Sequence, residues 1–129
     1  MLDTADDYHA LVAKAQAENR MVVIKFYASW CRACKAMAPK FTRLADDWPE
    51  IEFYEILFDN NKKLCKELQI KVLPYMEIVA GEAGKVESFT CGPSKISLLV
   101  SKLEDASSTY CFADTIECSD VTDLLDSDD

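Results

Sequence analysis

The feature that most constrains this chain is a Cys-X-X-Cys pair, Cys31 and Cys34, that stands between two segments of different periodicity. Residues 21–28 form an apolar run rich in β-branched side chains, which predicts a buried strand. Residues 31–47 carry large apolar side chains near helical spacing, with Pro39 among them, and predict a kinked helix. The two thiols are therefore expected at a strand-to-helix junction, which indicates an α/β fold.

The rest of the chain supplies further strands and helices around this unit. Thr4, followed three residues later by Asp7, is expected to cap a first helix. Asn60 and Ser94 are the expected N-caps of two later helices. The other expected segments are strands at 51–58, 75–79 and 85–90, a short helix at 62–68 and a last helix with apolar positions from 96 to 103. This order predicts a mixed sheet packed against helices.

Charge divides the chain into two parts. Its 129 residues carry a net charge of −9, and no lysine or arginine follows Lys102. Residues 105–129 hold eight acidic side chains, whereas residues 1–104 are nearly neutral. We therefore expect a domain over 1–104 and an acidic, cysteine-containing tail over 105–129 that is too poor in apolar residues to form its own core. Neither part has the basic patch typical of nucleic-acid binding or the roughly 20 apolar residues that cross a bilayer, so neither partner is expected.

A Cys-X-X-Cys pair can be structural, metal-binding or redox-active, and its surroundings distinguish these possibilities. At the start of a helix, Cys31 would meet unpaired backbone amides and the positive end of the helix dipole, which favour a thiolate. Cys34, one turn further on, is close enough to form a disulfide with Cys31 and to resolve a mixed disulfide. The chain has one such pair and one histidine, His9, so no metal site is expected. The pattern indicates a redox pair.

Several motifs resemble the thioredoxin family in order and spacing over residues 5–103. The segment FYASWCRACK at residues 26–35, followed by Pro39, is similar to the thioredoxin active site. The segment VLPY at residues 72–75 is similar to the cis-proline loop that faces it in that family. Glycines also stand at the positions where thioredoxins keep them, Gly84 and Gly92. The resemblance implies the α/β thioredoxin fold, a central mixed β-sheet flanked by helices on both faces.

Two further segments, residues 59–65 and 86–91, are most similar to the atypical cysteine/histidine-rich plastid thioredoxins. This part of the resemblance implies a chloroplast stromal protein whose transit peptide has been removed. The N-terminus, MLDTADD, is acidic and shows no apolar targeting core, so the cytoplasm is the other expected location.

The resemblance also implies a role for each residue of the candidate site. Cys31 would be the attacking thiolate and Cys34 the resolving thiol of a redox-active disulfide. The surface that receives the target would comprise Trp30, Leu73, Pro74 and Gly92, with a cis bond between Leu73 and Pro74. The implied activity is that of a protein-disulfide reductase without a bound cofactor. Its partners would be target proteins with disulfides or dithiols, and a separate reductase or small thiol as electron donor.

Two other functions stay open at this point. One is a disulfide isomerase or oxidase of the same fold, because the sequence does not set the direction of electron flow. The other is a non-catalytic module that docks a partner through the same surface. The presence of both Cys31 and Cys34 counts against the second, since binding alone needs neither thiol.

The chain departs from the thioredoxin pattern in two places. Between the cysteines, Arg32 and Ala33 stand where thioredoxins have Gly-Pro, and the charge of Arg32 should stabilise the thiolate and so the reduced form. Lys25 and Glu55 occupy, in reverse, the positions of a buried acid and its lysine partner. Opposite charges inside two apolar runs are expected to pair. The pair would either be structural or let Glu55 accept the proton of Cys34, and an exposed Lys25 is the remaining alternative.

Four more cysteines lie outside the pair. Cys65 is expected to be a half-buried core thiol. Cys91 would either pack at the end of a strand or act as a regulatory thiol beside the active site. Cys111 and Cys118 fall in the tail, where they could pair with each other, exchange with Cys31 or Cys91, or remain idle.

Overall fold

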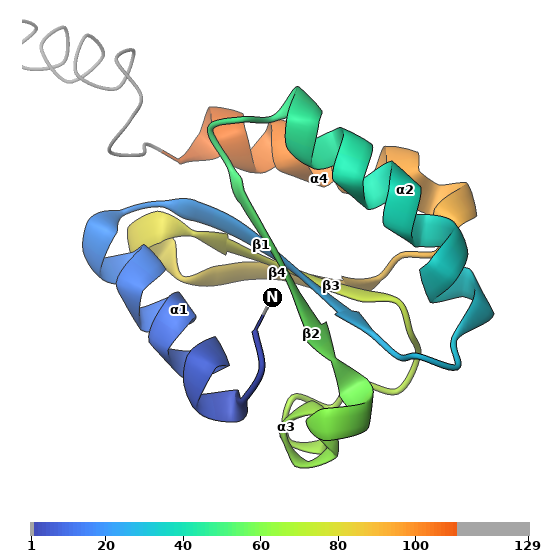
Figure 1. The fold of residues 1–129 in the computed structure, drawn as a ribbon. Coiled ribbons are helices and arrows are strands. Elements are labelled where there is room, and N and C mark those ends of the chain that lie inside the picture. The colour runs from blue at the N-terminus through green and yellow to red at the C-terminus, as the bar shows by residue number, and fades with distance from the viewer. Residues whose placement is uncertain (1, 111–129) are drawn as a thin grey trace, which may run out of the picture.

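The computed structural model describes residues 2–110, which form a four-stranded sheet with helices on both faces (Figure 1). The elements follow in the order α1 (Ala5–Glu18), β1 (Met21–Tyr27), α2 (Arg32–Asp47), β2 (Glu52–Leu57), η1 (Phe58–Asn60), α3 (Lys62–Glu67), β3 (Tyr75–Ala80), η2 (Gly81–Ala83), β4 (Lys85–Thr90), η3 (Pro93–Lys95) and α4 (Ile96–Thr109), where η marks a 3-10 turn. The expected strands and helices are present, and the ends of the strands and of the two middle helices differ by at most one residue from those the sequence predicts.

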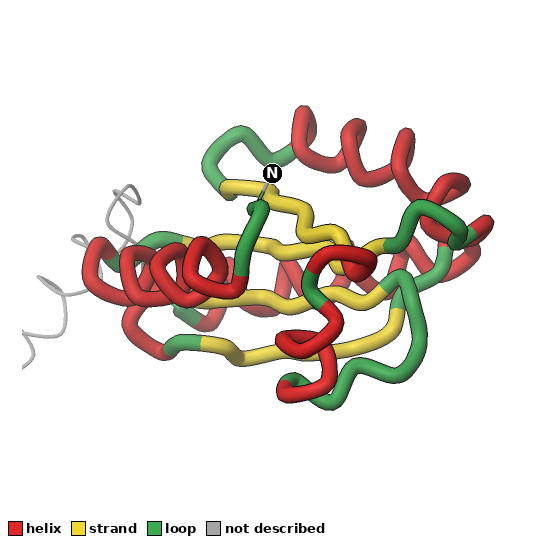
Figure 2. The backbone as a smooth tube through the Cα atoms, turned by 60° about the horizontal axis from the view of Figure 1, so that its bottom comes forward, coloured by secondary structure: helices red, strands yellow, loops and turns green. Residues whose placement is uncertain are grey.

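The sheet is mixed, as the sequence predicts. Its strand order is β2-β1-β3-β4, with β1 parallel to β2 and antiparallel to β3, and β3 antiparallel to β4. Figure 2 shows the four strands lying side by side between the helices. The register places Lys25 of β1 opposite Glu55 of β2. This order makes β2 an edge strand, which matters below for the environment of Glu55.

Helices α2 and α4 cover one face of the sheet, and α1 and α3 cover the other (Figure 1). On the first face, Met37 and Phe41 of α2 pack with Leu99 and Leu103 of α4. On the second face, Tyr8 of α1 packs with apolar residues of α3 and of the central strands. Burial of each large apolar side chain contributes about 1.5–3 kcal/mol, so the two layers hold the helices firmly against both faces of the sheet.

Both ends of α1 are closed by side chains. The hydroxyl of Thr4 accepts the amide of Asp7 at 3.1 Å, and the carboxylate of Asp7 accepts the amide of Thr4 at 3.2 Å, which confirms the predicted cap. At the other end Asn19 adopts the left-handed conformation with φ of 52°. Its side chain accepts the amide of Glu82 at 3.1 Å and so joins the end of α1 to the β3–β4 connection.

Two predicted caps are wrong. Asn61, not Asn60, stands at the N-cap of α3, and its amide group donates instead to backbone carbonyls of Asp3 and Leu57. Ser94 lies inside the 3-10 turn that Pro93 begins, so α4 starts later, without a side-chain cap. Proline favours the first position of such a turn because it has no amide to leave unpaired.

The last helix also runs further than expected. Residues 105–109, which the charge pattern assigns to the tail, continue α4 as far as Thr109. On this part of the helix Ala106 is buried against the core of the first face. The division into a domain and a tail stays a prediction, since residues 111–129 lie outside the described part of the chain.

A buried polar contact that the sequence does not reveal ties α1 to the sheet. The hydroxyl of Tyr8 donates to the carboxylate of Glu77 in β3 at 2.6 Å, and both side chains are buried. Lys85 reaches the second oxygen of Glu77 at 2.9 Å. Burial first, and then the bond to Glu77, raises the pKa of Tyr8, so the hydroxyl keeps its proton and remains a donor. The carboxylate is thus hydrogen-bonded and paired, which is what a buried charge requires.

Candidate redox site

Cys31 and Cys34 form a disulfide at the N-terminus of α2. Their Cα atoms lie 5.2 Å apart, and Cys31 is the N-cap residue of the helix. Its sulfur accepts the amide of Cys34 at 3.1 Å, so the nucleophile candidate takes the place that a serine or aspartate oxygen usually fills. The helix end therefore offers Cys31 both a hydrogen-bond donor and the positive end of the dipole.

The two cysteine residues differ little in burial. Cys31 is 7% exposed and Cys34 is 3% exposed, so both residues are buried. They form a cluster with Ala28, against which Tyr27, Leu73 and other half-buried side chains pack. Arg32 is exposed at the first position of α2, beside the pair.

Asp59 holds the loop that leads from β1 to the cysteines. Its carboxylate accepts the amide of Ser29 at 3.3 Å and a short hydrogen bond from the Ser29 hydroxyl. The side-chain hydrogen bond from Ser29 is the main cause that lowers the pKa of Asp59. Sequence reasoning missed this contact, although the position of Asp59 at the end of the β2 run, where parallel strands place their carboxyl ends together, was an available signal.

Trp30 and the loop before β3 form apolar surface around the disulfide. Trp30 is 67% exposed, and its ring stands edge-on to Phe58 with centroids 6.1 Å apart. Leu73 packs against the cysteine cluster, and the Leu73–Pro74 bond is cis, as the resemblance implied. Val72, next to them, is also exposed and extends this surface.

Gly92 joins this region through its neighbour in the chain. The amide of Cys91 donates to the carbonyl of Pro74 at 3.0 Å, which fixes the end of β4 beside the cis-proline loop. At Gly92 the backbone has φ of −76°, which any residue adopts, and a Cβ atom there would meet nothing within 4 Å. Neither backbone conformation nor packing therefore demands glycine at this position.

Lys25 and Glu55 do pair, with Nζ and Oε2 3.0 Å apart. The pair is not buried as expected, because the side chain of Lys25 is 1% exposed while that of Glu55 is 39% exposed. The reason is the place of β2 at the edge of the sheet, which leaves Glu55 beside solvent. The ammonium also lies over the rings of Phe41 and Tyr27, at 4.7 and 5.5 Å from their centroids. The structure thus has a buried lysine with a half-exposed partner.

The remaining described cysteines are fully buried. Cys65, expected to be half-buried, belongs to the core under α1, and Cys91 belongs to the core under α2 and α4. Burial raises the pKa of both thiols, that of Cys65 to about 11. The sulfur of Cys91 lies 3.3 Å from the carbonyl of Lys95. A regulatory role for Cys91 would need local opening of this core, and Cys111 and Cys118 lie outside the described residues.

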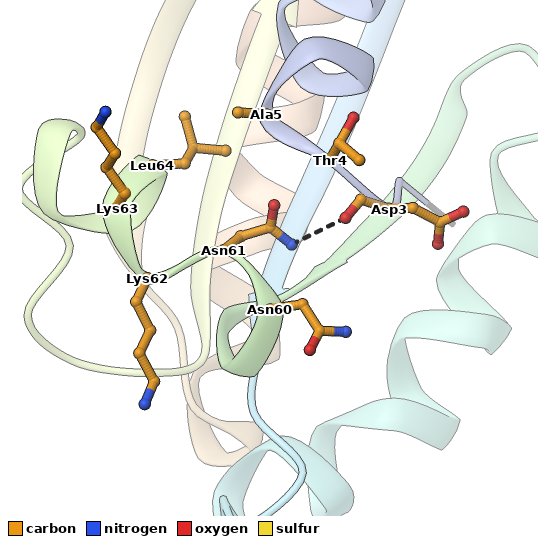
Figure 3. Close-up of a pocket in the computed structure, with 8 residues that line it drawn as sticks. All are labelled: Asp3, Thr4, Ala5, Asn60, Asn61, Lys62, Lys63 and Leu64. Carbon is orange, nitrogen blue, oxygen red and sulfur yellow. Dashed lines mark hydrogen bonds between the residues drawn. The ribbon is translucent and has the colours of Figure 1, made fainter.

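One hollow in the described surface is separate from the cysteines. A pocket of about 240 Å³ lies between the start of α1 and the start of α3 (Figure 3). It is lined by Asp3, Thr4, Ala5, Asn60, Asn61, Lys62, Lys63 and Leu64. The Asn61 side chain crosses it to the Asp3 carbonyl, and the ammonium groups of Lys62 and Lys63 point in opposite directions away from its centre. The pocket does not touch the disulfide.

Two other kinds of site are absent from residues 2–110. No three histidine, cysteine or acidic side chains gather there as a metal site would need. Among the helices of this part of the chain, none combines the length and the apolar character that a membrane crossing requires.

The fold and the site define a class: a mixed sheet between helices, with a cysteine pair at a helix N-terminus beside a cis-proline loop. Comparison with known families agrees, since the family described as Thioredoxin matches residues 1–105. The chain belongs to the thioredoxin family. The fold is accordingly the α/β thioredoxin fold that the sequence resemblance implied.

Two curated relatives show which branch of the family the chain resembles. "Thioredoxin-like 2, chloroplastic" of Oryza sativa subsp. japonica is 37% identical over 132 residues, which cover 98% of this chain and 58% of that protein. "Thioredoxin-like 2-2, chloroplastic" of Arabidopsis thaliana is 37% identical over 101 residues, covering 78% of this chain and 43% of that protein. The chain spans about half the length of these relatives. The similarity agrees with the expected likeness to atypical plastid thioredoxins.

Solved structures give the same fold. The short form of thioredoxin f from spinach chloroplast superposes with a TM-score of 0.70 at 32% identity, over 81% of this chain and 90% of that one. Thioredoxin of Fasciola hepatica superposes with a TM-score of 0.67 at 28% identity, over 78% of this chain and 92% of that one.

Proposed function

We propose that this chain is a protein thiol–disulfide oxidoreductase that works through Cys31 and Cys34. The observation that carries the proposal is the disulfide itself: it lies at the N-terminus of α2, between exposed Trp30 and the cis Leu73–Pro74 loop. The membership of the thioredoxin family supports it. Both sulfurs needed for exchange, and an apolar surface for a target, are thus in one place.

The reaction consists of two exchange steps. In the reduced protein the Cys31 thiolate attacks one sulfur of a target disulfide, forms a mixed disulfide and releases the second target sulfur as a thiolate, which takes up a proton. Cys34 then loses its proton and attacks the Cys31 sulfur, which frees the first target sulfur and closes the Cys31–Cys34 bond. Two electrons have passed to the target. A dithiol reductase or two small thiol molecules restore the dithiol by the same exchange.

The geometry around the pair favours Cys31 for the first attack. The Cys31 sulfur at the N-cap accepts the Cys34 amide, and a thiolate formed there would face the positive end of the helix dipole with the charge of Arg32 beside it. Cys34 lies inside the first turn of the helix, beyond the N-cap position. These differences favour Cys31 as the nucleophile and Cys34 as the resolving thiol.

Trp30, the Leu73–Pro74 backbone and Gly92 are proposed to receive the target. An extended target segment can lie along the Leu73–Pro74 backbone in β-like fashion, with apolar contacts to Trp30. The open space at Gly92 is explained if a target backbone passes there, because a side chain would obstruct it. No bound cofactor takes part in these steps.

A trapping experiment tests the proposal. Reduced Cys34→Ser protein should accumulate a mixed disulfide on Cys31 with an insulin-type substrate, whereas Cys31→Ser should accumulate far less. The parent protein, supplied with dithiothreitol, should reduce the substrate with turnover. Equal trapping by both variants would contradict the assigned roles, and the absence of turnover by the parent would favour a binding module.

Electron flow in the opposite direction is the second candidate. It is favoured by Arg32, since a positive charge beside the thiolate stabilises the reduced protein and makes the disulfide a better oxidant. The same protein would then take electrons from target dithiols. The midpoint potential against glutathione decides between reductase and oxidase, because an oxidase needs a potential above that of its targets.

A plastid location is part of this proposal. The relatives reported above carry the word chloroplastic in their names and are longer than this chain. Expression of the complete gene product as a fluorescent fusion would test it, with stromal fluorescence as the expected result and cytoplasmic fluorescence as the contrary one.

A further inference from the structure

A lysine lies where the core under α2 meets the redox site. The side chain of Lys25 is 1% exposed and its ammonium has three neighbours: the carboxylate of Glu55 at 3.0 Å, and the rings of Phe41 and Tyr27. Aromatic faces attract a cation but do not neutralise it. The exchange steps described above make no use of this charge.

The ring of Tyr27 links the ammonium to the cysteines. Its centroid is 5.5 Å from Nζ of Lys25, and the same side chain packs against the cluster of Ala28, Cys31 and Cys34. The partly buried ring of Tyr27 thus lies between the ammonium and the cluster that holds the reacting sulfurs. Charges interact more strongly where part of the intervening medium is protein than they do through solvent alone.

The two halves of the ion pair do not act equally on the cysteines. The carboxylate of Glu55 is 39% exposed at the edge strand β2, so water and salt screen it. The ammonium of Lys25 is withdrawn from water and keeps more of its field. Glu55 therefore opposes the field of Lys25 at the cysteine cluster only in part.

We propose that Lys25 sets the redox poise of the Cys31–Cys34 couple: its buried charge favours the thiolate-bearing reduced form and makes the protein a stronger oxidant, while Glu55 moderates the effect. This rests on the proposed exchange function. Reduction of the disulfide takes up two electrons and one or two protons, so the reduced pair carries negative charge when one sulfur stays a thiolate. Lys25 stabilises that charge without touching the sulfurs, and it is therefore a positioning residue.

Single replacements of Lys25 and of Glu55 should shift the midpoint potential in opposite directions. The loss of a purely structural contact would not do so. Lys25→Met removes the positive charge, so the equilibrium with reduced and oxidised glutathione should shift about tenfold towards the disulfide form. Tenfold corresponds to about 30 mV for a two-electron couple, in the reducing direction. Glu55→Gln removes the moderating charge, so the equilibrium with glutathione should shift a few-fold towards the reduced form and the midpoint potential should rise. The double variant should resemble Lys25→Met.

Lys85→Met is the matched control. Lys85 is also a strand lysine paired with a carboxylate, but its partner Glu77 lies on the α1 side of the sheet. This variant should lose stability and keep the parent potential. Lys25→Arg, which retains the charge, should keep the midpoint potential of the parent protein even if it lowers the melting temperature.

Three outcomes would overturn the proposal. They are an unchanged potential in both single variants, shifts of the same sign in both, or a shift in Lys85→Met as large as that in Lys25→Met. If Lys25→Met does not fold, Glu55→Gln and Lys25→Arg still test the proposal. Only a charge effect would raise the midpoint potential in Glu55→Gln and leave it unchanged in Lys25→Arg. If Glu55→Gln slows the release of mixed disulfides in a pH-dependent manner and leaves the potential alone, Glu55 is a proton acceptor instead. The potential is measured without a target, so failure of the proposed function appears separately, in the trapping experiment.

Discussion

Tyr8 in α1 and Glu77 in β3, 69 residues apart in the chain, are joined by a 2.6 Å hydrogen bond inside the core. Tyr8→Phe would leave one oxygen of a buried carboxylate without its donor, so we expect a loss of about 1–3 kcal/mol in the free energy of unfolding, measured with urea. Tyr54→Phe is the control: Tyr54 donates to Glu52 at 2.7 Å, but the contact is part-buried on edge strand β2. Its loss should be about 0.5 kcal/mol or less. Equal losses would mean that burial does not govern the cost.

Cys65 should make stability fall in alkaline solution. Burial, reinforced by Glu77, raises its pKa to about 11 from an ordinary value near 9. The unfolded thiol therefore ionises first as the pH rises, and stability that is complete below pH 9 is lost progressively up to about pH 11. The loss should be about 3 kcal/mol from this group. Urea unfolding of the parent and of Cys65→Ala at both ends of this range measures it. Cys65→Ala should be less stable throughout but should show a smaller drop.

The Lys25–Glu55 pair should be weakly coupled in stability. Because Glu55 is half exposed, a double-mutant cycle of Lys25→Met and Glu55→Gln should give a coupling energy of about 1 kcal/mol, below the roughly 3–5 kcal/mol lost when a fully buried pair is broken. Unfolding in urea at low and high salt is the measurement. A value above about 3 kcal/mol would show that Glu55 is shielded from water in solution.

Gly92 and Gly84 should respond differently to alanine. A Cβ at Gly92 meets open space, so Gly92→Ala should change stability by no more than about 0.5 kcal/mol while lowering kcat/KM for a protein disulfide several-fold. The rate with a small disulfide should stay the same. Gly84 has φ of 75°, and a Cβ there would lie 2.7 Å from the side chain of Gln16. Gly84→Ala should therefore cost at least about 1 kcal/mol. Unchanged protein-target kinetics in Gly92→Ala would remove Gly92 from the proposed docking surface.

The two tail cysteines should differ in reach. Ser107 near the end of α4 contacts Met21 at the start of β1, whereas the redox pair follows the other end of that strand, about 20 Å away. Cys111 directly follows Tyr110, but Cys118 comes eight residues after it, enough chain to span about 27 Å when extended.

If a tail thiol attacks the Cys31–Cys34 disulfide, the product is a tail–Cys31 bond with Cys34 freed as a thiol. We expect this product from Cys118 alone. Disulfide mapping by mass spectrometry should find it in Cys111→Ser and not in Cys118→Ser. A Cys111–Cys31 bond in the second variant would require α4 to open at its end.

The sequence was informative where local pattern and chemistry coincide. The apolar run before Cys31 and the helical spacing after it placed the redox pair correctly, because a buried strand and an amphipathic helix each have their own period. Long-range relationships were less accessible. Nothing local marks Glu77 as the partner of Tyr8, and the solvent exposure of Glu55 depends on β2 being an edge strand, which follows from strand order. The start of α4 was misplaced because Pro93 begins a separate turn.

The sulfur of Cys31 has a consequence for how redox state and folding are coupled. This one atom both accepts the Cys34 amide at the start of α2 and exchanges partners during reaction. Helix initiation and chemistry thus belong to one thermodynamic cycle. In that cycle the difference in unfolding free energy between oxidised and reduced protein is proportional to the difference in midpoint potential between the folded and the unfolded cysteine pair. A substitution deep in α2 that strengthens one redox form more than the other must therefore move the midpoint potential, even though it lies turns away from either sulfur.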